Sequence, residues 1–215
     1  MSRSFNEVPA RPTTARRVAR AALLAAASAA VLATANVAGA QSSAPQPHTW
    51  ELLFSSGALV PTGAQRHVLK DAALSTAQLS YVIGSKFALT TSLGWARSRD
   101  LGSVGDPKLD VFTYDVGVEA RAPRSIAGDA MTFTTFAGLG AGSRSYNYRS
   151  LDADATHNLA GYGAVGGELG RGRLHLRLEV RDYLTGFKPL AGSGASGTRN
   201  DVVALVGLRL GRRGS

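Results

Sequence analysis

The sequence contains no cysteine, and this absence excludes several classes of protein at once. Without thiols the chain has no disulfide framework, no thiolate metal site, no cysteine nucleophile and no N-terminal cysteine to carry a lipid. Aromatic residues are also few, at 7%, and charged residues make up only 18%. Hydrophobic residues reach 44%, and 25 of the 215 residues are glycine. This composition fits a packed β-protein with many turns better than a disordered chain or a coiled coil.

The net charge of +9 is distributed unevenly along the chain. Five arginines and one glutamate in the first 40 residues contribute +4 of it, which leaves +5 for the rest. Those remaining cations are scattered among acidic residues, without a basic stripe or a recognition helix. We therefore expect a solvated surface of mixed charge and no nucleic-acid partner.

The first 40 residues have the features of an export signal. A basic stretch ending at Arg20 precedes an Ala-rich apolar run over residues 21–37, and Ala38-Gly39-Ala40 supplies small residues for cleavage. The run is short for a spanning helix of about 20 residues, so a retained anchor is the weaker interpretation. We expect three parts: a signal peptide at residues 1–40 that is cleaved after Ala40, a linker at residues 41–48, and a folded domain at residues 49–215.

From Thr49 onward, apolar residues alternate with polar or small ones, and this period of two indicates β-strands. Between Phe87 and Trp95, for example, every odd-numbered residue is apolar or Thr91, and every even-numbered one is small or polar. The pattern predicts eight strands, near residues 49–60, 73–83, 87–97, 110–122, 131–144, 158–170, 174–184 and 202–210. Each is close to the roughly 9–11 residues that a tilted strand needs to cross a bilayer. Eight is also an even number, as in bacterial membrane barrels.

The predicted connections alternate between mostly short and longer ones. The short ones are 84–86, 123–130 and 171–173, and the longer ones are 61–72, 98–109, 145–157 and 185–201. Both ends of the barrel domain therefore lie on the side of the short turns. Across the first short turn, parity sets Ile83 opposite Phe87. Across the last, the sequence leaves two registers open, with Glu168 opposite either His175 or Arg177.

Four segments carry a resemblance to a known family. They are 50–63, which opens on Trp-Glu-Leu and ends on Val-Pro-Thr-Gly, together with 135–142 (TFAGLGAG), 163–170 (GAVGGELG) and 178–183 (LEVRDY). With these segments, the chain from about Trp50 to Leu210 resembles the outer-membrane β-barrel domain family, the small OmpA/OmpX-type eight-stranded barrels of diderm bacteria. The resemblance implies an all-β fold, namely an eight-stranded antiparallel up-and-down transmembrane β-barrel after a cleaved signal peptide. The chain departs from the family where Leu210 is followed by Gly-Arg-Arg-Gly-Ser instead of ending in an aromatic residue.

The polar face of the strands combines glycines with charged residues. On a solvent-facing surface such glycines weaken strands without benefit, but inside a narrow barrel they leave room for long side chains. We therefore predict that the polar face lines the lumen and forms a mutually neutralising structural network of Asp115, Glu119, Arg121, Glu168, His175, Arg177, Glu179 and Arg181. The apolar face then meets lipid, with aromatic residues towards the strand ends as interfacial girdles.

The sequence offers little that points to catalysis or to metal binding. The four histidines, His48, His67, His157 and His175, include no two at ligand spacing on one strand face. The acidic segment 152–157 is more typical of a solvated loop than of a cation site. The glycines of 138–142 lack the lysine and helix of a phosphate loop, and no His-x-Ser signature of lipid A deacylating barrels is present. We expect no catalytic residue, no cofactor and no metal.

Together these observations predict a non-enzymatic, monomeric outer-membrane protein that contacts outer-membrane lipids. Its role is expected to be structural or to involve a surface ligand or protein held by the longer connections 61–72, 98–109, 145–157 and 185–201. The filled polar lumen argues against a general porin. Two alternatives stay open: a membrane-embedded lipid-modifying enzyme, and a soluble lipocalin-like periplasmic ligand binder with the faces reversed. The Gly-x-Trp signature of lipocalins is absent around Trp50.

Overall fold

The computed structural model describes residues 49–127, 130–149, 155–187 and 197–211. The predicted signal peptide, its cleavage after Ala40 and the linker at 41–48 lie outside the described residues. The acidic residues Asp152 and Asp154 lie outside them as well.

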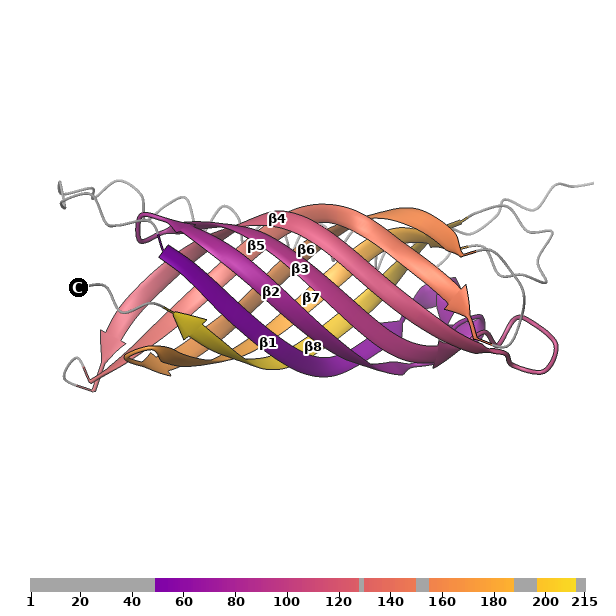
Figure 1. Ribbon diagram of the computed structural model, residues 1–215, viewed down its shortest axis with the longest axis horizontal. Coiled ribbons are helices and arrows are strands. Elements are labelled where there is room, and N and C mark those ends of the chain that lie inside the picture. Colours follow the sequence, from indigo (N-terminus) through magenta and orange to yellow (C-terminus); the bar gives the residue numbers. More distant parts are fainter. Residues whose placement is uncertain (1–48, 128–129, 150–154, 188–196, 212–215) are drawn as a thin grey trace, which may run out of the picture.

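Eight antiparallel strands form a closed barrel in which each strand pairs with its neighbours in the chain (Figure 1). Pairing of the first strand with the last completes the ring, with Leu53 opposite Arg209, so the barrel has no free sheet edge along this seam. The strands are β1 (Thr49–Pro61), β2 (Ala72–Ile83), β3 (Phe87–Arg99), β4 (Lys108–Ile126), β5 (Met131–Tyr148), β6 (Thr156–Arg171), β7 (Leu174–Phe187) and β8 (Gly197–Gly211). Within the described residues, no helix has the length and hydropathy needed to span a membrane.

All eight predicted strands are present, but most extend further towards the longer connections than predicted. β3 continues to Arg99, and β4 begins at Lys108. The predicted connections 98–109, 145–157 and 185–201 were therefore too long, because backbone pairing continues beyond the last clearly alternating residues. The connection between β1 and β2 is not irregular throughout, since it contains the short 3-10 helix η1 (Gly63–His67).

The registers of the short hairpins follow their turn residues. Ile83 lies opposite Phe87, as predicted. In the last hairpin the turn is Gly172-Arg173, and Gly172 has a positive φ of 62°, a conformation that glycine adopts without steric cost. Because this turn sets Arg171 opposite Leu174, Glu168 comes to lie opposite Arg177. The structure thus selects one of the two registers that the sequence left open.

The two faces of the barrel wall have opposite chemistry. Large apolar side chains point outward and are strongly exposed, including Leu93 at 58% and Val116 at 66%. Charged side chains point inward, and Glu168 and Arg177 are only 1% and 2% exposed. Alternation of side chains across a strand produces this separation directly. The barrel is therefore apolar outside and polar inside through much of its length.

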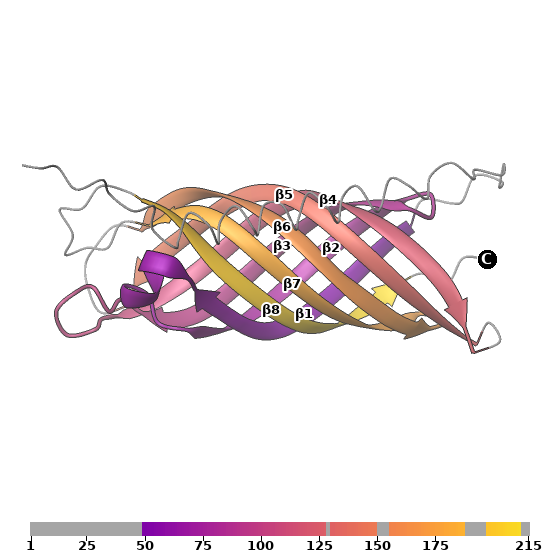
Figure 2. The same ribbon diagram turned by 180° about the vertical axis from the view of Figure 1, so that it is seen from behind.

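Towards the longer connections, the lumen contains many apolar side chains in addition to buried polar ones such as Arg144 and Asp201. A cluster of buried side chains fills this end: Leu59, Leu69, Ala72, Leu74, Ala96, Leu109, Val111, Tyr146, Tyr148, Ala160, Tyr183, Val203 and Leu205. Figure 2 shows η1 at the same end of the barrel, between the ends of β1 and β2. The side chains of Gln65 and Leu69, from this connection, are almost completely buried.

Candidate functional site

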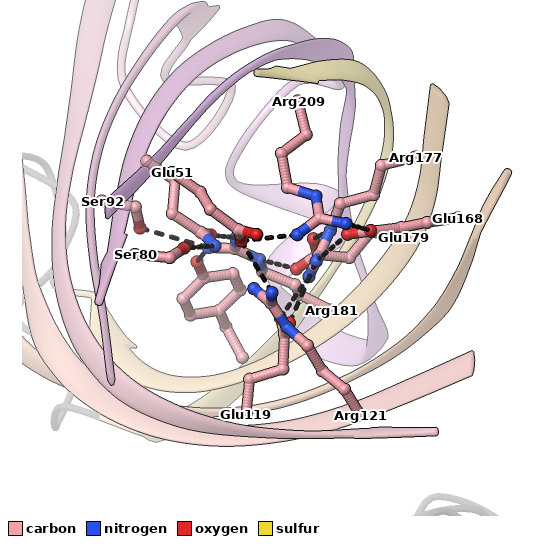
Figure 3. A network of polar contacts seen from close by, with 12 residues as sticks. Glu51, Ser80, Ser92, Glu119, Arg121, Glu168, Arg177, Glu179, Arg181 and Arg209 are labelled. Carbon is pink, nitrogen blue, oxygen red and sulfur yellow. Dashed lines mark hydrogen bonds and ion pairs between the residues drawn. The ribbon is translucent and has the colours of Figure 1, made fainter. Parts of the chain in front are cut away.

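The most organised polar site is a network of acids and arginines inside the half of the barrel nearer the short turns (Figure 3). Its side chains come from β1, β4, β6, β7 and β8. Along each strand their positions alternate with the apolar residues of the outer face. The strand period therefore delivers them to the lumen, and closure of the barrel brings non-adjacent strands within reach of one another.

Three glutamates and three arginines form a closed ring of alternating charge. Glu51 contacts Arg121 Nη1 at 2.6 Å and Arg209 Nη1 at 2.5 Å. Arg121 Nε lies 2.5 Å from Glu119, and Arg209 pairs with Glu168. Arg177 completes the ring by binding both of these glutamates. Each charge in this ring has oppositely charged neighbours on two sides, which offsets much of its desolvation.

Arg177 is the most highly connected residue of this ring. Its guanidinium lies 2.5 Å from Glu119, 2.7 Å from Glu168 and 2.7 Å from Glu179. It also stacks over the ring of Phe136, at 3.5 Å from the centroid. The planar guanidinium offers five donors in fixed directions, so one arginine can serve three carboxylates at once.

A second arm of the network runs from the ring towards the middle of the barrel. Glu179 pairs with Arg181 as well as with Arg177. Arg181 donates a 2.7 Å hydrogen bond to Gln78 Oε1 and lies 3.7 Å from Asp115. The hydroxyl of Tyr183 donates to Asp115 at 2.7 Å. Hydrogen bonds of this kind satisfy groups that water does not reach.

The network of ring and arm contains one more acid than arginine. Its acids are Glu51, Asp115, Glu119, Glu168 and Glu179, and its arginines are Arg121, Arg177, Arg181 and Arg209. Nearer the longer connections, Arg144 and Asp201 form a further, fully buried pair, and Arg144 lies over the ring of Tyr183. Asp115 is the network acid that meets only one arginine, and at the longest distance.

Glycines make room for the large side chains of the lumen. A Cβ atom at Gly140 would overlap the ring of Tyr162, and a Cβ atom at Gly166 would overlap the ring of Phe136. Tyr162 in turn packs beside Tyr183, with ring centroids 5.2 Å apart. These two inward-facing glycines thus lie beneath aromatic side chains.

The structure brings together seven of the eight residues singled out from the sequence. Asp115, Glu119, Arg121, Glu168, Arg177, Glu179 and Arg181 are all buried in the lumen. His175 is less enclosed and lies at the edge of the network, where its Nδ1 is 3.3 Å from Arg209. Among the described residues, no group of three or more His, Cys, Asp or Glu is arranged to hold a metal ion.

The predicted network did not include two members of the ring, Glu51 and Arg209. Both stand between apolar residues on their strands, as Trp50-Glu51-Leu52 and Leu208-Arg209-Leu210. That alternation assigns Arg209 to the polar face already in the sequence, and the same signal could have placed Glu51 there. Arg144 and Asp201 lack such a signal, because the pattern becomes irregular near the longer connections.

No protein-family model and no curated protein matches the chain. Similarity is found at the level of solved structures. Neisserial surface protein A (NspA) aligns with 75% of this chain and 96% of its own, at a TM-score of 0.50 and 11% sequence identity. The outer membrane protein AlkL aligns with 81% of this chain and 95% of its own, at a TM-score of 0.47 and 14% sequence identity. Ail of Yersinia pestis aligns with 79% of this chain and 100% of its own, at a TM-score of 0.44 and 9% sequence identity.

At this level of identity the similarity concerns the fold. Strand number, antiparallel order and closure all agree with it, since β1 to β8 pair consecutively and β8 returns to β1. The protein therefore has the fold of the small eight-stranded outer-membrane β-barrels.

Proposed function

We propose that this protein is a non-enzymatic, monomeric barrel of the bacterial outer membrane with a structural or surface-binding role. The observation that carries the proposal is the separation of side chains across the wall, apolar outside and ion-paired inside. Such an outer face is stable where it meets hydrocarbon, whereas in water it would expose a large contiguous apolar surface. The backbone groups within the closed ring of strands are paired, as a bilayer requires.

The filled lumen supports the part of the proposal that excludes a general porin. Eight strands enclose an interior just wide enough for side chains. Here the alternating ring of charges occupies one half, and the apolar cluster around Leu109 and Tyr146 occupies the other. The Gln65 and Leu69 side chains add to the closure from the β1–β2 connection.

The two alternative functions receive less support from the described residues. A soluble barrel that binds an apolar ligand needs its apolar face inside, which is the reverse of the arrangement at Leu93 and Glu119. For a lipid-modifying enzyme, the lumen offers no free carboxylate among Glu51, Glu119, Glu168 and Glu179, because each of these acids is ion-paired with arginine.

Orientation and location can be tested with single cysteines, because the chain has none of its own. Val104→Cys places a thiol in the connection between β3 and β4, and Ser85→Cys places one in the opposite turn between β2 and β3. In intact cells, a membrane-impermeant maleimide is expected to label the cysteine at 104 and to label the one at 85 only after lysis. Labelling of the cysteine at 85 alone would place the short turns, and not the longer connections, outside the cell. Recovery of the protein without detergent would contradict the membrane location.

Conductance in planar bilayers tests the closed lumen. The purified protein is expected to give no steady large-pore current, and an open porin inserted under the same conditions provides the positive control. A steady large-pore current would show that the charged ring and the apolar cluster do not block passage.

A further inference from the structure

The outer face of β3 and β4 changes from aliphatic to aromatic to charged over a few cross-strand pairs. Towards the longer connections these pairs are Leu93 with Tyr114, Trp95 with Phe112, Arg97 with Asp110, and Arg99 with Lys108. Successive pairs on one face lie about 6.6 Å apart along the strands. The charged pairs therefore begin immediately beyond the aromatic residues, where a membrane-embedded barrel passes from hydrocarbon to headgroups.

A depression of about 320 Å³ lies at this end of the outer face, and its charges are mostly positive. We call it the basic rim, and its charged residues are Lys70, Asp71, Arg97, Arg99, Lys108 and Arg149. Five cations thus surround one acid. Such an excess of positive charge in one small depression attracts anions. Salt screens the attraction little, because a bound anion lies closer to the cations than the Debye length.

The cations of the basic rim are only partly compensated by the protein. Arg149 pairs with Asp110 at 2.6 Å, and Arg97 lies over the ring of Trp95, 4.5 Å from its centroid. Lys70, Arg99 and Lys108 form no ion pair with any residue that the structure describes. Because like charges directly opposite each other in a sheet repel, the Arg99–Lys108 pair is unfavourable on its own.

Backbone contacts hold these three uncompensated cations together. Arg99 and Lys108 are cross-strand partners in the β3–β4 ladder. The backbone N–H of Lys70 donates to the carbonyl of Arg99 at 3.1 Å, and the neighbouring Leu69 bridges to Asp100. The repelling charges therefore cannot separate by moving their main chains, and a bound anion would relieve their repulsion.

We propose that the basic rim binds the phosphate group of an anionic lipid of the surrounding leaflet. This inference rests on the proposed membrane location. Guanidinium and ammonium donors match phosphate oxygens in charge and hydrogen bonding. The acyl chains of the same lipid would pack against Trp95 and Leu93, the next outward-facing residues of β3. A free phosphate has no acyl chain to make this contact. Position beside the aromatic residues thus favours a lipid over a soluble anion.

Lipid retention by the purified protein tests the proposal. The protein in mixed micelles is offered phosphatidic acid and phosphatidylcholine, and bound lipid is measured by native mass spectrometry. We expect selective retention of phosphatidic acid. Attraction near a membrane surface corresponds to roughly five-fold in affinity per cation, so Arg99→Gln and Lys108→Gln should each weaken retention by about that factor, and the double variant by roughly thirty-fold. Arg66→Gln, an exposed cation of η1 outside the basic rim, should retain the lipid like the parent.

Further arms distinguish the sources of the anion. Phosphatidic acid, which binds the folded protein, should raise its thermal unfolding midpoint. Inorganic phosphate in phosphatidylcholine micelles should not do so, and equal stabilisation by both would overturn the lipid assignment in favour of a soluble phosphate. Equal loss of lipid in Arg66→Gln and Arg99→Gln would overturn the site. If the protein inserts into phosphatidylcholine vesicles but shows no preference for phosphatidic acid, only this inference fails. If it does not insert into vesicles at all, the proposed membrane location fails and this inference fails with it.

Discussion

Arg177 Nη2 lies 2.5 Å from Glu119 Oε2, although 58 positions separate the two residues in the chain. Arg177 is on β7 and Glu119 is on β4, which are not neighbours in the barrel, so their contact crosses the lumen. Both side chains are almost fully buried. A charge pair in this position joins two separate parts of the wall, and its stability depends on the whole network remaining balanced.

Replacing Arg177 by methionine should destabilise the barrel strongly. The change leaves Glu119, Glu168 and Glu179 without their shared partner, and removal of one member of a buried ion pair typically costs about 3–5 kcal/mol. Urea unfolding of the protein in lipid vesicles, followed by the mobility of the folded form on gels, measures the loss. Arg66→Met on the exposed η1 is the control and should unfold like the parent. Equal midpoints for the two variants would contradict a stabilising role of the network.

The network contains one acid more than it contains arginines, and this imbalance predicts that two isosteric substitutions affect stability differently. Asp115→Asn removes the excess negative charge and keeps an oxygen that accepts from Tyr183, so its stability should stay within about 1 kcal/mol of the parent. Glu119→Gln removes the carboxylate shared by Arg121 and Arg177 and should cost about 3–5 kcal/mol. The same unfolding experiment compares both variants directly. A larger loss for Asp115→Asn than for Glu119→Gln would show that the charge balance is set elsewhere.

Gly140 should be intolerant of a side chain because of a single neighbour, Tyr162. The three atoms nearest to a Cβ atom at Gly140 would all belong to the Tyr162 side chain, and overpacking of this kind costs roughly 1–3 kcal/mol. Gly140→Ala should therefore lower the thermal unfolding midpoint. In the Tyr162→Leu background, where a smaller side chain replaces the ring, the same Gly140→Ala change should lower the midpoint less. Gly163→Ala is the matched control, because its nearest atom would be 3.8 Å away. A clash at Gly140 that Tyr162→Leu fails to relieve would place the obstacle in the backbone.

If the outer surface of the barrel faces lipid, the effect of a new arginine on folding should depend on whether it lies on the wall, and not on how exposed the position is. Val116 is 66% exposed on the wall of the barrel, and Val104 is fully exposed in the β3–β4 connection. Arginine at a lipid-facing position near the bilayer midplane costs about 2–4 kcal/mol. Val116→Arg should therefore reduce folding into vesicles markedly, while Val104→Arg should not. Equal folding yields for both variants would indicate that the wall faces water.

The sequence by itself determined the strands and the faces on which their side chains lie, because a period of two assigns each residue to one side of the wall. For Glu119 and Arg121, alternation with Val118 and Ala120 was sufficient to predict burial in the lumen. The first hairpin register was also predictable, since parity and the short turn leave few choices for Ile83 and Phe87.

The tertiary structure decided which buried charges meet. Partners such as Glu51 with Arg209, or Glu119 with Arg177, depend on closure of the barrel and on the stagger of its strands, which no local pattern encodes. Near the longer connections, apolar residues occupy both faces, as in Leu59-Val60 and Val202-Val203, so the period no longer separates inside from outside. Only the packed structure shows that Leu59 and Val203 fill that end of the lumen, because their burial depends on residues brought from the other side of the barrel.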